Sequence, residues 1–151
     1  MDITNLLDED LIELGFQAAS KEEVLQKVSQ IVYRSGRLTN RESYFEGLLE
    51  RERTSTTGFG EGIAIPHAKI KEVVQPTISV IKLKKPVDWN AMDDQPVSLV
   101  IALAVPERDQ GTLHLQLLAK LSEQLMEEDF REELLEADSK RDVYNVINNI
   151  F

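Results

Sequence analysis

The sequence predicts a single α/β domain over residues 1–151, with a mixed, mostly five-stranded β-sheet flanked by helices on both faces. Segments with apolar residues at helical spacing alternate with strand-like runs, as expected for a sheet covered by helices. Residues 97–105 are almost continuously apolar, which is typical of a central strand that is buried on both sides. No internal repeat, low-complexity segment or linker divides the chain.

The chain is expected to begin with a short strand followed by an amphipathic helix. The strand is predicted at residues 11–14 and is expected to end at Gly15. The helix is predicted to begin at Ser20, because Glu23 lies three residues later and completes a capping box. A Ser-Gly pair at residues 35–36 should end it.

A second helix and a half-buried strand are predicted next. Thr39 and Glu42 repeat the capping signature, and the helix should end near Thr54. Residues 77–83 alternate well enough for a strand, which the Lys-Lys-Pro sequence at 84–86 should break.

The second half is expected to contain the central strand and three helices. Pro106 closes the apolar run, and Thr112 is expected to cap the following helix. Phe130 and the leucines after it suggest a short helix, and Ser139 with Asp142 should cap the last one.

Composition and charge exclude several classes of function. The net charge of −10 disfavours nucleic-acid binding, since an acidic surface repels phosphate backbones. The acidic side chains could favour basic protein partners, although keeping helical surfaces solvated explains them better. The absence of cysteine fits a cytoplasmic domain and excludes disulfides and thiolate chemistry. Neither a secretory signal nor an apolar run of membrane-spanning length is visible.

Residues 50–69 contain the strongest candidate for chemistry. They pass from the charged end of the second predicted helix through three glycines within residues 58–62 to an apolar run and then Pro66 and His67. Glycine allows close approach of another molecule, and Pro66 biases the residue before it towards an extended conformation. We therefore expect an open, glycine-lined surface and a short extended segment that presents His67 at its end.

Other kinds of site fit this sequence less well. The glycines precede an extended run and a proline, whereas dinucleotide and P-loop motifs lead into a helix. A zinc site lacks ligands, because the chain has two histidines, no cysteine and no H-E-x-x-H motif. No G-x-S-x-G elbow is present for a serine hydrolase. A purely structural role for His67 stays open at this point, because a lone histidine after a strand often has one.

The second histidine, His114, follows the predicted central strand on the first turn of a helix. Functional groups gather at the carboxyl ends of strands in open α/β sheets. A pair of imidazoles with an arginine suits a transferable phosphoryl group, because one ring nitrogen can attack phosphorus while the other groups stabilise its oxygens. A structural role for His114 at its helix start is an equal alternative.

Residues 58–68, G-F-G-E-G-I-A-I-P-H-A, resemble the active-histidine signature of the fructose–mannitol type (type-2) EIIA domains. These domains belong to the bacterial phosphoenolpyruvate-dependent sugar phosphotransferase system. Arg51 matches the active-site arginine of the family, and residues 97–105 with Thr-Leu-His-Leu at 112–115 resemble its central strand and second-histidine helix. The likeness covers nearly the whole chain. One departure is Glu52, where many members carry aspartate.

The resemblance implies a phosphoryl carrier that accepts the group from the phosphocarrier protein HPr on His67. His114 and Arg51 would complete the catalytic site. The group would then pass to an EIIB protein or domain, and a membrane EIIC component would couple it to sugar entry. No cofactor, metal, nucleic acid or direct membrane insertion is implied.

Two alternatives accompany this interpretation. A regulatory, nitrogen-type EIIA paralogue would act by phosphorylation-dependent protein binding. A plain interaction module would leave His67 unreactive. Among transport components, the apolar run at residues 97–105 resembles galactitol-type members more than mannitol-type members.

Overall fold

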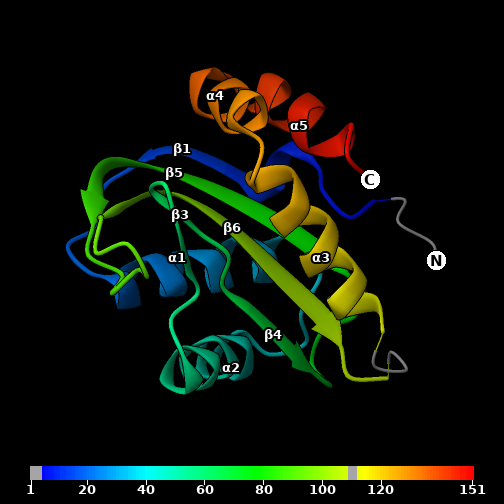
Figure 1. The fold of residues 1–151 in the computed structure, drawn as a ribbon. Helices are drawn as coiled ribbons and strands as arrows, with labels where there is room; N and C mark the ends of the chain where they lie inside the picture. Colours follow the sequence, from blue (N-terminus) through cyan, green and yellow to red (C-terminus); the bar gives the residue numbers. More distant parts are fainter. Residues whose placement is uncertain (1–4, 109–111) are drawn as a thin grey trace.

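The computed structural model describes residues 5–108 and 112–151, and its core is one mixed six-stranded sheet (Figure 1). The strand order is β1-β5-β6-β3-β2, and β4 also pairs with β6. The strands are β1 (Ile12–Phe16), β2 (Gly58–Gly60), β3 (Ile63–Ala64), β4 (His67–Ile70), β5 (Thr77–Val87) and β6 (Val97–Pro106). The helices are η1 (Glu9–Leu11), α1 (Lys21–Arg34), α2 (Arg41–Thr54), α3 (Leu113–Leu125), α4 (Glu128–Glu136) and α5 (Lys140–Asn148).

The apolar run predicted to be the central strand is β6, and this prediction is confirmed. It pairs antiparallel with β5 on one side and parallel with β3 and β4 on the other. Every residue of β6 except Ser98 is buried, because neighbouring strands and packed helices surround it. β3 and β4 follow one another along the same side of β6, so the break between them lies against the centre of the sheet.

Helices cover both faces of the sheet, as the sequence predicts. α1 and α2 pack against each other on one face, where α1 contacts β5 and α2 contacts β4. α3 crosses the other face over β6, while α4 and α5 stand at the β1 edge (Figure 1). The fold is therefore the predicted single mixed sheet, with six strands where mostly five were expected.

Two of the four predicted helix caps form through side chains, and two predictions are wrong. Ser20 Oγ accepts from the Glu23 amide at 3.3 Å and Ser139 Oγ from the Asp142 amide at 3.1 Å, as expected. The cap of α2 is Asn40 instead of Thr39, because the amide and the hydroxyl of Thr39 both donate to the Glu72 carbonyl, at 2.8 and 3.4 Å. Thr112 precedes α3 without a side-chain cap bond, since its backbone is already helical.

Two predicted strand ends are also wrong, and irregular strand pairing explains both. Gly15 lies inside β1 with φ of +69°, where the register with β5 shifts, so a bulge accommodates it. β5 continues past Pro86 to Val87, which pairs with Val97 after another shift in register. A proline is tolerated at such an irregularity because no ladder hydrogen bond from its nitrogen is required.

Candidate functional site

His67 is the first residue of β4, and the backbone of β6 fixes its position. It lies opposite Leu103, whose amide donates to the Pro66 carbonyl at 3.0 Å. The prediction that His67 ends an extended segment is therefore corrected: only Ile65 and Pro66 separate β3 from β4, and His67 opens the second strand. The central strand thus holds the candidate nucleophile from the backbone side.

The two ring nitrogens of His67 have different partners. Nδ1 lies 2.9 Å from the Ile65 carbonyl oxygen, and Arg51 Nε donates to Nε2 at 3.1 Å. A carbonyl can only accept and a guanidinium can only donate, so both contacts require the neutral tautomer with its proton on Nδ1. The lone pair therefore resides on Nε2, which is the nitrogen able to attack an electrophile.

Arg51 reaches His67 from the last turns of α2, and a second contact anchors it. Its Nη1 donates to the carbonyl oxygen of Ser55 at 2.8 Å and to the hydroxyl of the same residue at 3.3 Å. The planar guanidinium is therefore held at its helix end while it faces the imidazole.

A close approach of α2 to β4 brings the arginine within reach. A Cβ atom at Gly47 would lie 3.1 Å from the Cβ of Ala68, the residue after His67. The hydroxyl of Tyr44, one helical turn earlier, is buried and donates to the Leu103 carbonyl at 3.0 Å. Sequence reasoning missed Gly47, although a lone glycine in a helix interior is the signal that marks such packing.

His114 is the second residue of α3, and it lies near enough to His67 to lower the pKa of that ring electrostatically. Its Nδ1 is buried and has no hydrogen-bond partner among the described residues. An orphaned polar nitrogen of this kind is costly to bury unless a ligand satisfies it at some stage. The structure thus gathers all three residues that the sequence singled out: Arg51, His67 and His114.

The environment of His67 lowers its pKa below the ordinary value of 6.5. Burial is the main cause, and electrostatic interactions with Arg51 and His114 act in the same direction. The hydrogen bond to Ile65 and the negative charge of Glu52 oppose the shift. The imidazole is therefore neutral at pH 7, the state that a nucleophile requires.

The glycine segment folds as a tight β2–β3 hairpin. Gly60 and Gly62 have φ values of +109° and +78°, which side chains disfavour, and they flank Glu61 at φ of +59°. The Glu61 amide donates to Asp93 at 3.0 Å, so the loop between β5 and β6 holds the tip of the hairpin. The predicted open glycine surface is wrong at Gly58, where an added Cβ would lie 2.7 Å from the backbone of Ala91. That glycine serves internal packing.

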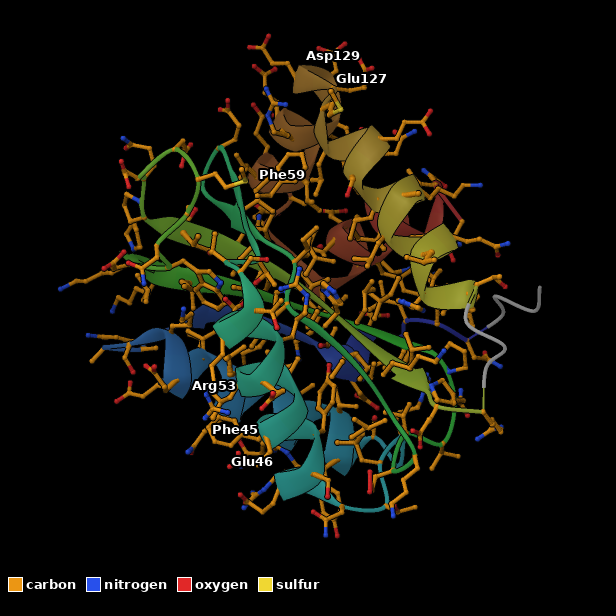
Figure 2. All side chains as sticks on the ribbon, turned by 60° about the horizontal axis from the view of Figure 1, so that its bottom comes forward. Phe45, Glu46, Arg53, Phe59, Glu127 and Asp129 are labelled. Carbon is orange, nitrogen blue, oxygen red and sulfur yellow. The ribbon has the colours of Figure 1, made fainter. Side chains whose placement is uncertain are left out.

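Side chains around the site present both charge and apolar surface. Figure 2 looks onto α2, with Arg53 near its end and Phe59 on the hairpin beyond it. Phe59 and Ile65 are half-buried, whereas Leu115, next to His114, is 58% exposed. No group of three or more His, Asp or Glu side chains within the described ranges is placed to hold a metal ion.

Comparison with known proteins places this geometry in a family. The family described as "Phosphoenolpyruvate-dependent sugar phosphotransferase system, EIIA 2" matches residues 5–150. The chain belongs to this family. It is thus an EIIA phosphoryl carrier and a phosphotransferase component, as the motif around His67 predicted. None of the helices in the described part of this EIIA domain has the length and hydropathy of a membrane span.

Two relatives show how such EIIA domains occur. The chain is 40% identical over 149 residues to the fructose-specific EIIA component of Haloferax volcanii, covering 99% of this chain and 96% of the relative. It is 41% identical over 148 residues to the fructose-specific EIIABC component of Bacillus subtilis. That alignment covers 98% of this chain and 23% of the relative, so the chain spans about a quarter of that protein.

Solved structures share the fold over nearly their whole length. The nitrogen regulatory protein IIA-Ntr from Neisseria meningitidis superposes with a TM-score of 0.87 at 32% identity, covering 94% of this chain and 96% of that one. The mannitol enzyme IIA of Escherichia coli, solved in complex with phosphorylated enzyme IIB, gives 0.79 at 25% identity, covering 95% and 97%.

Proposed function

We propose that this EIIA domain carries its phosphoryl group on Nε2 of His67, accepting it from HPr and passing it to an EIIB protein or domain. The observation that carries the proposal is the tautomer of His67, which leaves the lone pair on Nε2 beside Arg51. The structure of the mannitol enzyme IIA in complex with phosphorylated enzyme IIB supports the choice of EIIB as the acceptor of the phosphoryl group. We place both transfers in the cytoplasm, where the family resemblance puts this domain.

In the acceptance step, the Nε2 lone pair forms a bond to phosphorus as the bond between phosphorus and the donor atom breaks. Nδ1 keeps its proton, which stays hydrogen-bonded to the Ile65 carbonyl. This hydrogen bond stabilises the positive charge that the ring gains. The reverse sequence of bond changes hands the group to the acceptor. His67 is thus regenerated with its proton still on Nδ1.

Arg51 and His114 stabilise the phosphoryl oxygens in this proposal. The Arg51 guanidinium now donates to the nitrogen that must attack, so it has to leave Nε2 and turn to the oxygens. The unpartnered Nδ1 of His114 gains a partner if its proton bonds to a phosphoryl oxygen. The contacts of Arg51 and His114 with the phosphoryl oxygens form only when the phosphoryl group is at the site. They therefore stabilise the transition state of transfer more than the binding of the partner protein.

We further propose that HPr and EIIB use one surface in turn. In this proposal the half-buried side chains of Phe59 and Ile65 and the exposed Leu115, which belong to the hairpin, the link before His67 and the start of α3, serve as its apolar rim. Partner side chains that pack on this rim would exclude water from the phosphoryl group.

Mass spectrometry after incubation with phosphoenolpyruvate, enzyme I and HPr tests the function. We expect one acid-labile phosphate per chain, absent from His67→Ala and formed more slowly in His114→Ala. Phosphate on serine or threonine, or phosphate retained in His67→Ala, would contradict the assignment.

The fructose names of the two relatives favour fructose as the transported sugar, ahead of mannitol or galactitol. A regulatory role is the second candidate, because the nitrogen regulatory structure superposes with a TM-score of 0.87. Transfer from the phosphorylated domain to an EIIB encoded beside it would support transport. A neighbouring nitrogen sigma-factor gene and no transfer to EIIB would support regulation.

A further inference from the structure

Glu52 follows Arg51 directly in α2, and its carboxylate is almost completely enclosed, with 4% of the side chain exposed. Every group that reaches it is a donor or a cation. Oε2 accepts from the Thr57 amide at 3.3 Å and lies 3.6 Å from Lys21 Nζ. Oε1 accepts from the Thr57 hydroxyl and, at 3.3 Å, from the Trp89 indole. An ionised carboxylate only accepts, so this environment matches the charged form.

These contacts join parts of the chain that are distant in sequence. Lys21 begins α1, Thr57 precedes β2, and Trp89 lies in the connection between β5 and β6. The fully buried Trp89 indole also donates to the Thr57 hydroxyl at 3.1 Å. The segment that leads from α2 into the hairpin is therefore held from three sides.

The hydrogen bonds continue from Thr57 to the nucleophile. The Ile65 amide donates to the Thr57 carbonyl at 3.0 Å, and the Ile65 carbonyl accepts from His67 Nδ1 at 2.9 Å. A shift of Thr57 would consequently move the carbonyl that selects the tautomer of His67. On its other side, Glu52 is joined covalently to Arg51, which contacts Nε2 of the same ring.

We propose that Glu52 is a positioning residue for phosphoryl transfer, because its carboxylate fixes Thr57 and, through Ile65, holds His67 with a free Nε2. This inference rests on the proposed function of His67. Glu52 acts through other residues and through its charge, which opposes the effects of Arg51 and His114 on the pKa of His67.

Glu52→Gln tests the proposal, with Glu50→Gln as the matched control. Glu50 flanks Arg51 on the other side but is 77% exposed and pairs only with the exposed Arg53 at 3.2 Å among the described residues. Both variants lose one negative charge next to Arg51, and only Glu52→Gln presents an amide to the enclosed donors. Comparing the two variants therefore separates the loss of a negative charge from the loss of the contacts that enclose the Glu52 carboxylate.

Three measurements detect the effect of Glu52→Gln on His67. ¹⁵N NMR of the histidine ring reports the tautomer of His67 without any phosphoryl transfer. We expect nearly pure Nδ1-protonated ring in the wild type and in Glu50→Gln, and a mixture with a further lowered pKa in Glu52→Gln. The fluorescence of Trp89, the only tryptophan, should change in Glu52→Gln alone. Phosphorylation by HPr should slow about 100-fold, the typical effect of misplacing reacting groups by about 1 Å.

The outcomes separate this inference from the proposed function. Wild-type protein that takes no phosphate on His67 would overturn the function, while the tautomer measurement would still decide the role of Glu52. A Glu52→Gln variant with the wild-type tautomer and rate would overturn the positioning role alone. If Glu52→Gln does not fold, Thr57→Val removes the hydroxyl link and keeps the backbone groups. An unchanged tautomer and transfer rate in that variant would also overturn the proposal.

Discussion

Replacing Arg51 with alanine has two opposing effects on phosphoryl transfer, and their magnitudes decide the outcome. The change frees the Nε2 lone pair from its 3.1 Å contact, and for this part-buried hydrogen bond from a charged group we take the low end of the usual range, about 1.5 kcal/mol net. It also removes a donor aimed at the developing charge, which typically costs about 2.7–4 kcal/mol. The difference, about 1.2–2.5 kcal/mol, corresponds to a reaction about 10- to 70-fold slower.

The assay is the rate of His67 phosphorylation by phosphorylated HPr, measured for Arg51→Ala and for the control Arg53→Ala. Arg53 lies two residues away, is 64% exposed and contacts Glu50, so its loss should leave the rate unchanged. Arg51→Lys should recover only part of the rate, because an ammonium cannot reproduce the planar fork. NMR titration should show a raised His67 pKa in Arg51→Ala, since the arginine charge lowers it. A folded Arg51→Ala that transfers as fast as the wild type would refute this reasoning.

Four further predictions concern pH and packing. Because the folded pKa of His67 is below 6.5, the loss of transfer rate at low pH should have its midpoint below pH 6.5; a midpoint at or above pH 6.5 would contradict this. The same lowered pKa contributes to the free energy of unfolding at pH values above about 6.5, the pKa of histidine in the unfolded chain. Chemical denaturation at a series of pH values should show this contribution disappearing as the pH falls through the folded pKa. Val100→Asp places a charge at a fully buried position of β6 and should cost about 3–5 kcal/mol, so an unchanged melting temperature would count against the central strand. Gly58→Ala should destabilise the fold by about 1–3 kcal/mol, because its Cβ would lie 2.7 Å from Ala91; equal stability in urea titration would show that the loop yields freely.

Local signals in the sequence were sufficient where short-range chemistry decides the structure. Ser20 and Ser139 cap their helices as predicted, because a capping bond joins residues three positions apart. The apolar run of β6 identified the centre of the sheet, since a strand covered on both faces excludes polar residues. Where long-range pairing competes, local signals failed: Thr39 bonds to Glu72 across the fold and leaves the cap to Asn40.

The sequence by itself singled out the residues that we propose for the chemistry, namely His67, His114 and Arg51, because their types and motif are local properties. Only the tertiary structure decided how they are used. The tautomer of His67 depends on a guanidinium from 16 positions earlier, and Gly47 matters only because α2 packs against β4. The enclosure of Glu52 depends on Lys21 and Trp89, which are 31 positions before it and 37 after it. Such contacts form when the chain collapses around a shared core, and no periodicity or motif along the sequence records them.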